Sequence, residues 1–197
     1  MLLYIEIEYV CRKKGTNMKR KDIIELTLSA MFIAIGLVLP FFTGQIQQIG
    51  NMLLPMHLPV MLCGLVCGWK YGLAVGLVLP LLRSLLFGMP NLFPNAVAMS
   101  FELAVYGLVI GIVFVVIKKR NILSIYISLI ISMISGRIVW GIVMALLMGF
   151  AENSFTVKAF LSGALFNAIP GIIIQLILIP AIMIAIEKTK LLYFKRD

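Results

Sequence analysis

The chain has 197 residues, of which 62% are hydrophobic and only 13% are charged, and its mean hydropathy is +1.09. A soluble domain carries about a quarter of its residues as charged side chains, so this composition excludes a soluble globular protein and indicates an integral membrane protein. The net charge of +9 does not indicate a nucleic-acid-binding protein, because the basic residues form short clusters between long apolar runs.

The chain is predicted to contain one membrane domain between two cytoplasmic tails. Residues 1–18 form the first tail, since they alternate polar and apolar residues and lack the cleavage site of a signal peptide. Met18 precedes a Lys-Arg-Lys run, which leaves Met1 and Met18 as candidate starts and residues 1–17 as a candidate gene-model extension. Residues 19–190 are expected to form the membrane domain, and residues 191–197 the second tail.

Apolar runs of membrane length define the predicted helices. A helix needs about 20 apolar residues to cross the hydrocarbon core, and such runs occur at 23–43, 92–117, 122–148 and 160–186. The apolar stretch 53–88 is interrupted by Gly68-Trp69-Lys70-Tyr71-Gly72, which predicts two shorter helices joined by a tight turn. The sequence therefore predicts an all-α bundle of six transmembrane helices.

Basic residues predict the orientation of this bundle, because lysine and arginine are retained on the cytoplasmic side of a membrane. They occur in every second predicted loop, at Arg12, Lys13, Lys14, Lys19, Arg20, Lys21, Lys70, Lys118, Lys119, Arg120, Lys188, Lys190, Lys195 and Arg196. The opposite loops, near 44–52, 89–93 and 149–158, contain only one basic residue, Lys158. Both termini are therefore expected to lie in the cytoplasm.

Small residues four positions apart recur on the predicted helices. The sets are Ala30 and Ala34, Gly64 and Gly68, Gly72 and Gly76, Gly107 and Gly111, and Gly141, Ala145 and Gly149. This spacing lets helix backbones approach closely in lipid. A set that faces inward is expected to pack helices of this chain, and one that faces outward is expected to dock a partner. The pair Cys63 and Cys67, also four apart, is expected to serve packing.

Three ionisable side chains, Arg83, Glu102 and Arg137, lie inside predicted membrane helices. Each is a candidate functional residue, because such a group costs roughly 2.5–3.5 kcal/mol at the bilayer centre on insertion scales. Glu102 either neutralises one arginine to hold helices together or faces a binding site. In both cases one arginine is left over, and its guanidinium suits the two oxygens of a carboxylate or phosphate.

Polar side chains are concentrated in the predicted outer half of the bundle. The amides there are Gln45, Gln47, Gln48, Asn51, Asn91, Asn95, Asn167 and Gln175. Loop amides are common at membrane surfaces, whereas Asn167 and Gln175 lie within an apolar helix and are stronger candidates. His57, the only histidine, either lies at the membrane interface or contacts a substrate. The residues expected to bind a substrate are Arg83, Arg137, Glu102, Asn95, Asn167, Gln48, Asn51 and His57.

Motifs for nucleotide hydrolysis and bond cleavage are absent from the sequence. It contains no GxxxxGK[ST], GxSxG or HExxH pattern, and its single histidine leaves no evident base for a catalytic triad. An enzyme, a cofactor and a metal site are therefore not expected. A transporter without its own ATPase must borrow energy or use a gradient, so a stand-alone secondary carrier of a small organic anion, with Glu102 carrying a proton, stays open.

From Lys19 to about Lys190 the chain resembles the substrate-binding S components of energy-coupling factor (ECF) vitamin importers. The resemblance rests on the size, the six predicted helices and five segments: Ala30-Met-Phe-Ile-Ala34, Leu54-Pro-Met-His-Leu-Pro-Val60, Pro80-Leu-Leu-Arg-Ser-Leu-Leu-Phe-Gly-Met-Pro90, Phe101-Glu-Leu-Ala-Val-Tyr-Gly107 and Gly136-Arg-Ile-Val-Trp-Gly141. It implies a multi-pass protein of the prokaryotic plasma membrane.

The same resemblance implies partners and a substrate. Ala30 and Ala34 would pack against a membrane-embedded coupling subunit, which two cytoplasmic ATPases drive. A vitamin would bind on the outer side under the loop 45–51, and the protein would topple in the membrane to release it. Two arginines against one membrane glutamate favour an anionic vitamin such as pantothenate or nicotinate. Riboflavin, folate and biotin stay open, and cobalt or nickel is disfavoured because an amino-terminal histidine ligand is absent.

Overall fold

The computed structural model describes residues 20–43, 54–117, 121–150 and 169–188, and every regular element in these ranges is helical. The α-helices are α2 (Arg20–Val38), α4 (His57–Val66), α5 (Trp69–Phe87), α6 (Val97–Val116), α7 (Ile122–Phe150) and α9 (Ile169–Lys188). A 3-10 turn, η1 (Leu39–Thr43), extends α2, and a π-helical turn, η2 (Leu92–Ala96), precedes α6.

Five helical stretches are long and apolar enough to cross a membrane: Lys21–Phe41, Trp69–Phe87, Leu92–Val116, Ile122–Met148 and Ile169–Ile186. All but Trp69–Phe87 agree with the predicted runs of membrane length, although the structure does not describe 160–168. The helix α4 has 10 residues, and at 1.5 Å per residue it covers about half of a hydrocarbon core. Among the described residues, five helices thus meet the length for a span, and α4 does not.

The prediction of two shorter helices over 53–88 is right for α4 and wrong for α5, which has 19 residues. The cause is the position of the turn. Gly68 adopts φ +90°, a conformation that side chains rarely allow, and no atom lies within 4 Å of where its Cβ would be. Gly68 therefore makes the turn between α4 and α5, and its predicted packing role beside Gly64 is wrong.

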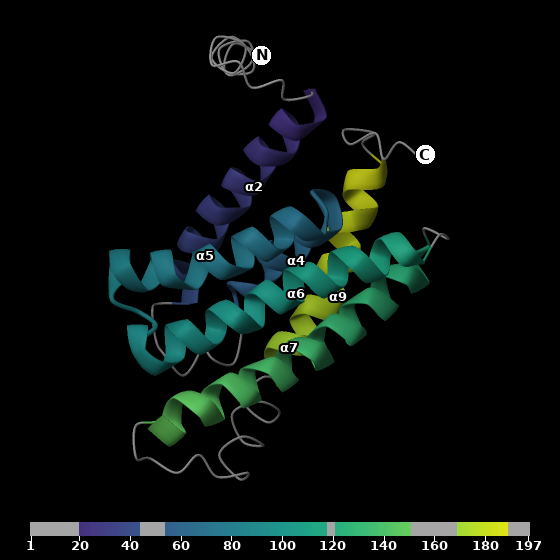
Figure 1. Cartoon of the computed structure of the whole chain (residues 1–197). Helices are drawn as coiled ribbons and strands as arrows, with labels where there is room; N and C mark the ends of the chain where they lie inside the picture. The colour runs from purple at the N-terminus through teal and green to yellow at the C-terminus, as the bar shows by residue number, and fades with distance from the viewer. Residues whose placement is uncertain (1–19, 44–53, 118–120, 151–168, 189–197) are drawn as a thin grey trace.

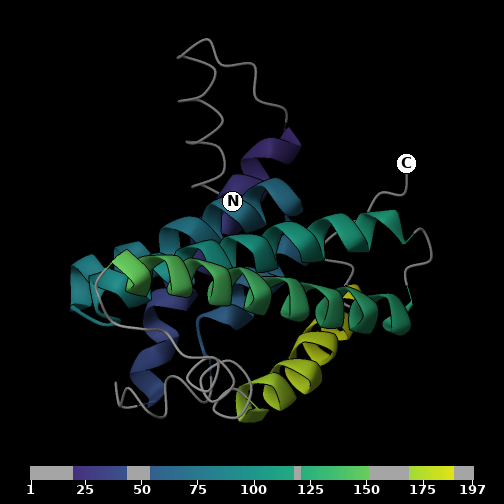
Figure 2. The same ribbon diagram turned by 60° about the horizontal axis from the view of Figure 1, so that its bottom comes forward.

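The short helix α4 lies at the centre of the bundle and packs against α2, α5, α6 and α9. Nine of its residues are buried, as expected for a helix that is apolar on all sides. Figures 1 and 2 show α6 running alongside α7, and α6 also packs against α5. Cys63 and Cys67 are buried in this core, where the Cys63 thiol donates a 3.6 Å hydrogen bond to the Ser29 hydroxyl.

Glycines allow α4, α5 and α6 to touch through their backbones. A Cβ on Gly64 or on Gly72 would lie 2.6 Å from the carbonyl oxygen of Gly107, and a Cβ on Gly107 would overlap the backbone of Gly72. One turn away, a Cβ on Gly76 would overlap the backbone of Leu103. The prediction that these glycines pack helices of the same chain is confirmed.

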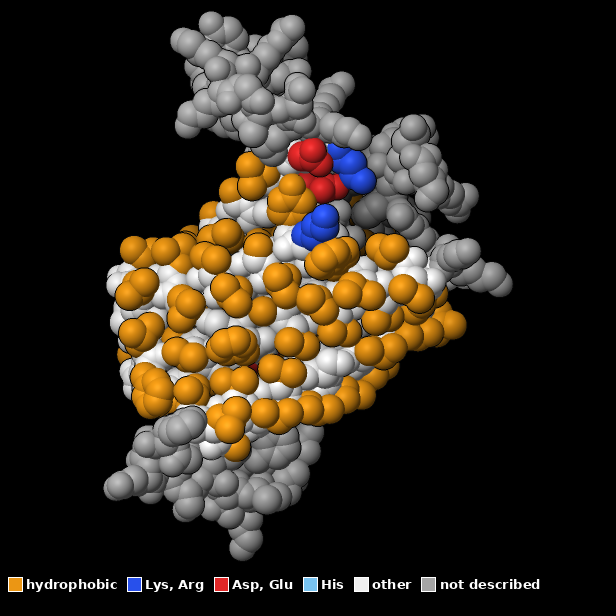
Figure 3. Space-filling model, viewed as in Figure 1, with side chains coloured by type: hydrophobic (Ala, Val, Ile, Leu, Met, Phe, Trp, Pro, Cys, Tyr) orange, Lys and Arg blue, Asp and Glu red, His pale blue; other side chains and the backbone are white. Residues whose placement is uncertain are grey.

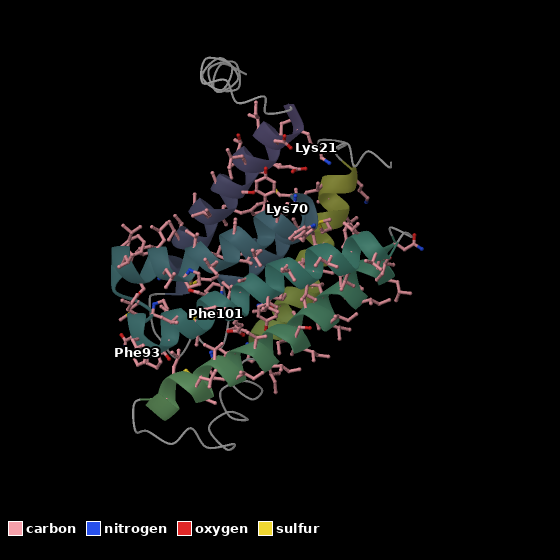
Figure 4. All side chains as sticks on the ribbon, viewed as in Figure 1. Lys21, Lys70, Phe93 and Phe101 are labelled. Carbon is pink, nitrogen blue, oxygen red and sulfur yellow. The ribbon has the colours of Figure 1, made fainter. Side chains whose placement is uncertain are left out.

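Most of the visible surface is hydrophobic, and charged side chains gather at one end of the bundle (Figure 3). Lys21 and Lys70 lie at this end (Figure 4), and Lys21 forms a 3.7 Å ion pair with Glu25. The last residues of α9 reach the same end (Figure 1). Basic residues from three helices therefore meet at one end of a surface that is otherwise suited to lipid.

Candidate functional site

The start of α4 is held in place by the carbonyl oxygen of Leu54. This oxygen accepts hydrogen bonds from the His57 backbone N–H at 3.0 Å and from the side-chain nitrogen of Gln175 at 3.5 Å. Gln175 is buried, so the bond to Leu54 satisfies a polar group that would otherwise be costly inside the bundle. In this way α9 fixes the position at which His57 begins α4.

His57, Glu102 and Arg137 come together from α4, α6 and α7. The Glu102 Oε1 atom lies 3.0 Å from Arg137 Nη1 and 3.5 Å from His57 Nε2. The exposed side-chain fractions are 2% for Glu102, 1% for His57 and 12% for Arg137. We call these three residues the buried polar cluster. Glu102 thus pairs with Arg137.

Tyr106 completes the surroundings of the cluster. It lies one helical turn after Glu102, and its ring meets the His57 imidazole edge-on, with centroids 5.1 Å apart. A Cβ on Gly136 would lie 2.9 Å from the Tyr106 ring, so the absence of a side chain beside Arg137 makes room for the tyrosine. Tyr106 was not among the predicted site residues, although its spacing of four from Glu102 was a usable signal.

Several polar atoms of the cluster lack hydrogen-bond partners within the part of the chain that the structure describes. They are Nδ1 and Nε2 of His57, Oε1 of Glu102, and Nε and Nη2 of Arg137, all of them buried. The 3.0 Å contact between Glu102 and Arg137 is accordingly an ion pair without hydrogen-bond geometry. Buried polar groups normally have partners, so such a concentration of unpartnered atoms is typical of a ligand site.

The geometry of the Arg137 guanidinium is informative. Its Nη1 atom faces Glu102, whereas Nε and Nη2, the two unpartnered atoms, form the opposite edge of the planar group. Two parallel N–H groups on one edge match the two oxygens of a carboxylate or phosphate. Both atoms are buried, so an anion would reach this fork only once the atoms that cover it have moved, while Glu102 occupies the remaining nitrogen.

Arg83 has a different environment. Its side chain is buried, and its Nη1 atom donates a 2.7 Å hydrogen bond to the carbonyl oxygen of Leu37, in the last turn of α2. The guanidinium carbon lies 5.3 Å and 5.5 Å from the ring centroids of Phe41 and Phe87, which contact each other edge-on. Within the described residues no carboxylate lies within ion-pair distance of Arg83. Aromatic faces and a helix carbonyl thus stabilise the positive charge.

A family model for ECF transporter substrate-specific components matches residues 25–183. The chain belongs to this family. It is therefore a substrate-specific membrane component of an ECF transporter, a class of transport subunits and not of enzymes, and it works on a small molecule together with an ECF module. No match was found among curated proteins or among solved structures.

Among the described residues, the other predicted site residues of this S component form no hydrogen bond or ion pair with the buried polar cluster. Asn95 is half-buried in η2, close in sequence to the start of α6. Gln48, Asn51 and Asn167 lie outside the described residues, as does the loop 45–51. Ala30 and Ala34 are both exposed on α2, next to the exposed Met31 and Ile35. Unlike the glycines of α4 to α6, this alanine pair faces away from the bundle.

Proposed function

We propose that this S component binds a small vitamin that carries a carboxylate, of the pantothenate or nicotinate type, and that Arg137 holds the carboxylate. The observation that carries the proposal is the unpartnered edge formed by Nε and Nη2 of Arg137, buried next to Glu102 and His57. A cationic vitamin is disfavoured there, because the only carboxylate of the cluster is already paired with a guanidinium.

Glu102 and Tyr106 have supporting roles in this proposal. The charge attraction between Glu102 and Nη1 holds this side of the guanidinium at Glu102, so that its opposite edge is left for the substrate. The Tyr106 ring separates the imidazole of His57 from the backbone at Gly136 and restricts both neighbours. His57 adds a nitrogen that can bind the same anion.

We further propose that the cluster faces the outside of the cell and that both termini lie in the cytoplasm. Lys21 and Lys70 mark one end of the bundle, and Phe101, which precedes Glu102, lies toward the other (Figure 4). Because lysine is retained on the cytoplasmic side, the end with Lys21 and Lys70 is assigned to the cytoplasm. The cluster then lies in the half of the bundle from which an importer captures its substrate.

Ala30 and Ala34 are proposed to dock the membrane-embedded coupling subunit, which is itself driven by two cytoplasmic ATPases. Both alanines are exposed, and small residues four apart allow a helix of another subunit to approach the α2 backbone closely. The glycines of α4 to α6 are closed by backbone contacts inside the bundle, whereas Ala30 and Ala34 on α2 remain open to a partner.

Arg83 is assigned a positioning role in place of the substrate contact that the sequence suggested. Its hydrogen bond to Leu37 and its two aromatic neighbours join the end of α2 to α5. Because α2 carries the proposed docking surface, Arg83 would keep this surface in a fixed relation to the rest of the bundle.

The proposal is tested by mild extraction of the protein from cells grown in rich medium, followed by mass spectrometry of the copurified small molecules. Calorimetric titrations then compare nicotinate with nicotinamide, and pantothenate with its alcohol pantothenol. We expect a copurified carboxylate vitamin and much weaker binding of its neutral analogue. Equal binding of acid and neutral analogue would refute the role of Arg137. An empty protein that binds no vitamin, and that moves an organic anion in response to a proton gradient without ATP, would instead identify a secondary carrier.

A further inference from the structure

The buried polar cluster has a simple charge balance. Glu102 contributes one negative charge and Arg137 one positive charge, and they pair at 3.0 Å. At pH 7.5 an ordinary histidine, with a pKa of about 6.5, is mostly neutral. With a neutral His57, the cluster has no net charge before a substrate binds.

The groups that face His57 can be named for each neighbouring element. From α6 they are Glu102 and the neutral phenol Tyr106, and from α7 it is Arg137. From α9 the nearby polar side chain is the amide of Gln175, which bonds to Leu54. Among the described residues, α2 and α5 present no charged group to His57. Only the Glu102–Arg137 pair therefore sets the local charge.

A carboxylate at the free edge of Arg137 would add one negative charge to this neutral, buried cluster. An uncompensated charge inside a protein is costly, so binding is favoured if a positive charge arrives with the anion. Protonated His57 would supply it. Protonation makes both imidazole nitrogens donors. Within the described residues neither nitrogen has a hydrogen-bond partner, so both are available to donate. One could then donate toward Glu102, whose Oε1 lies 3.5 Å from Nε2, and the other toward the substrate.

We propose that the site takes up its carboxylate substrate together with one proton, which His57 accepts from the solvent. The inference rests on the proposed function, since it requires an anion at Arg137. Protonation of His57 explains the balance better than protonation of Glu102, because a neutral Glu102 would give up its ion pair with Arg137. The proton adds to an imidazole nitrogen and no other bond changes, so the site is neutral both before and after binding.

The sign of the pH effect follows from the number of bound protons. The complex holds one proton more than the free protein, so binding weakens as the pH rises. In the range where free His57 is neutral and bound His57 is protonated, Kd should increase about tenfold per pH unit. A neutral analogue such as nicotinamide or pantothenol brings no charge, so its binding should be nearly independent of pH.

The test is isothermal titration calorimetry of the full-length protein at pH 7.5 with nicotinate, pantothenate and biotin as probes. Each titration is run in phosphate and in Tris, whose ionisation enthalpies differ, so the difference in heat counts the protons taken up. We expect about one proton for each carboxylate that binds. Binding with no proton uptake would overturn this inference and leave the carboxylate site standing, whereas no binding by any of the three probes would overturn both.

Two variants sharpen the result. Glu102→Gln leaves the positive charge of Arg137 to balance the anion alone, so proton uptake should fall to zero while binding persists and loses its pH dependence. Lys70→Gln, at the opposite end of the bundle, should keep the uptake of one proton. Persistent uptake in Glu102→Gln would overturn the charge-balance argument. If Glu102→Gln does not fold, the two-buffer titration of the unaltered protein decides the question.

Discussion

Removing the charge of Arg137 should have two separable effects, one on folding and one on binding. In Arg137→Met the Glu102 carboxylate, 2% exposed, loses its cationic partner. Breaking a buried pair from one side costs about 3–5 kcal/mol, because an uncompensated charge stays in the interior. The loss of a charged hydrogen bond to the substrate should weaken binding by about 1.5–3 kcal/mol, which is roughly 10- to 150-fold in Kd.

A second substitution separates the two effects. Arg137→Met combined with Glu102→Gln removes both charges, so most of the lost stability should return, because no unpaired charge remains. The substrate affinity should stay low, since the fork of Arg137 is still missing. Glu102→Gln alone leaves the charge of Arg137 unpaired, so it should also lower the stability of the free protein, but it should still bind the carboxylate because the fork is intact.

The measurements are thermal unfolding in detergent and calorimetric titration with nicotinate and pantothenate. Lys70→Met serves as the control, because it removes a positive charge at the opposite end of the bundle. Wild-type affinity in Arg137→Met would refute the role of Arg137 as ligand. A double variant no more stable than Arg137→Met would refute the claim that the lost stability comes from the isolated charge of Glu102.

Three further outcomes are expected from other parts of the chain. Leucine at Ala30 and Ala34 should abolish copurification with the coupling subunit without changing substrate affinity, since both residues face outward. Gly107→Val should destabilise the fold by about 1–3 kcal/mol in thermal unfolding, because its side chain would overlap the backbone of Gly72. Arg83→Leu should lower the unfolding temperature while Kd stays within about twofold, because a charged hydrogen bond of the fold is lost but no substrate contact.

The alanine and glycine substitutions have matched controls, and an opposing result exists for all three changes. Leucine at Ala145 and Ala181, exposed on α7 and α9, should leave the coupling subunit attached. If this control variant also loses the coupling subunit, the docking surface is not confined to α2. Ala74→Val, on the exposed side of α5, is the control for Gly107→Val and should change stability by less than about 0.5 kcal/mol. If Gly107→Val is as stable as the wild type, that result would contradict the close approach of α5 and α6. Loss of substrate affinity in Arg83→Leu would return Arg83 to the binding site.

The existence of the long helices could be predicted from the sequence, because lipid requires long apolar segments whose backbone bonds are satisfied internally. The predicted runs 92–117 and 122–148 correspond closely to η2 with α6 and to α7. The short length of α4 could not be predicted. The sequence placed a turn within Gly68-Trp69-Lys70-Tyr71-Gly72, but only the positive φ of Gly68 shows that α5 begins directly after it and that α4 ends at Val66.

For the site, the three ionisable residues of the membrane helices were found from the sequence, since charges in lipid are rare and costly. Their pairing was not. Arg83 and Arg137 are equivalent in a hydropathy plot, yet one is enclosed by Phe41 and Phe87 and the other pairs with Glu102. Nothing in the sequence distinguishes them, because the distinction depends on which helix faces stand opposite each other.

Composition, the length of apolar runs and the spacing of small residues are properties of single segments, so they were enough to identify a multi-helix membrane protein. Which small residues are covered follows from the packing of the helices, since Gly72 is closed by Gly107 whereas Ala30 and Ala34 face outward. This packing also brought His57 into contact with Glu102 across 45 positions of the sequence. Such contacts arise from the packing of whole helices, and no local pattern records them.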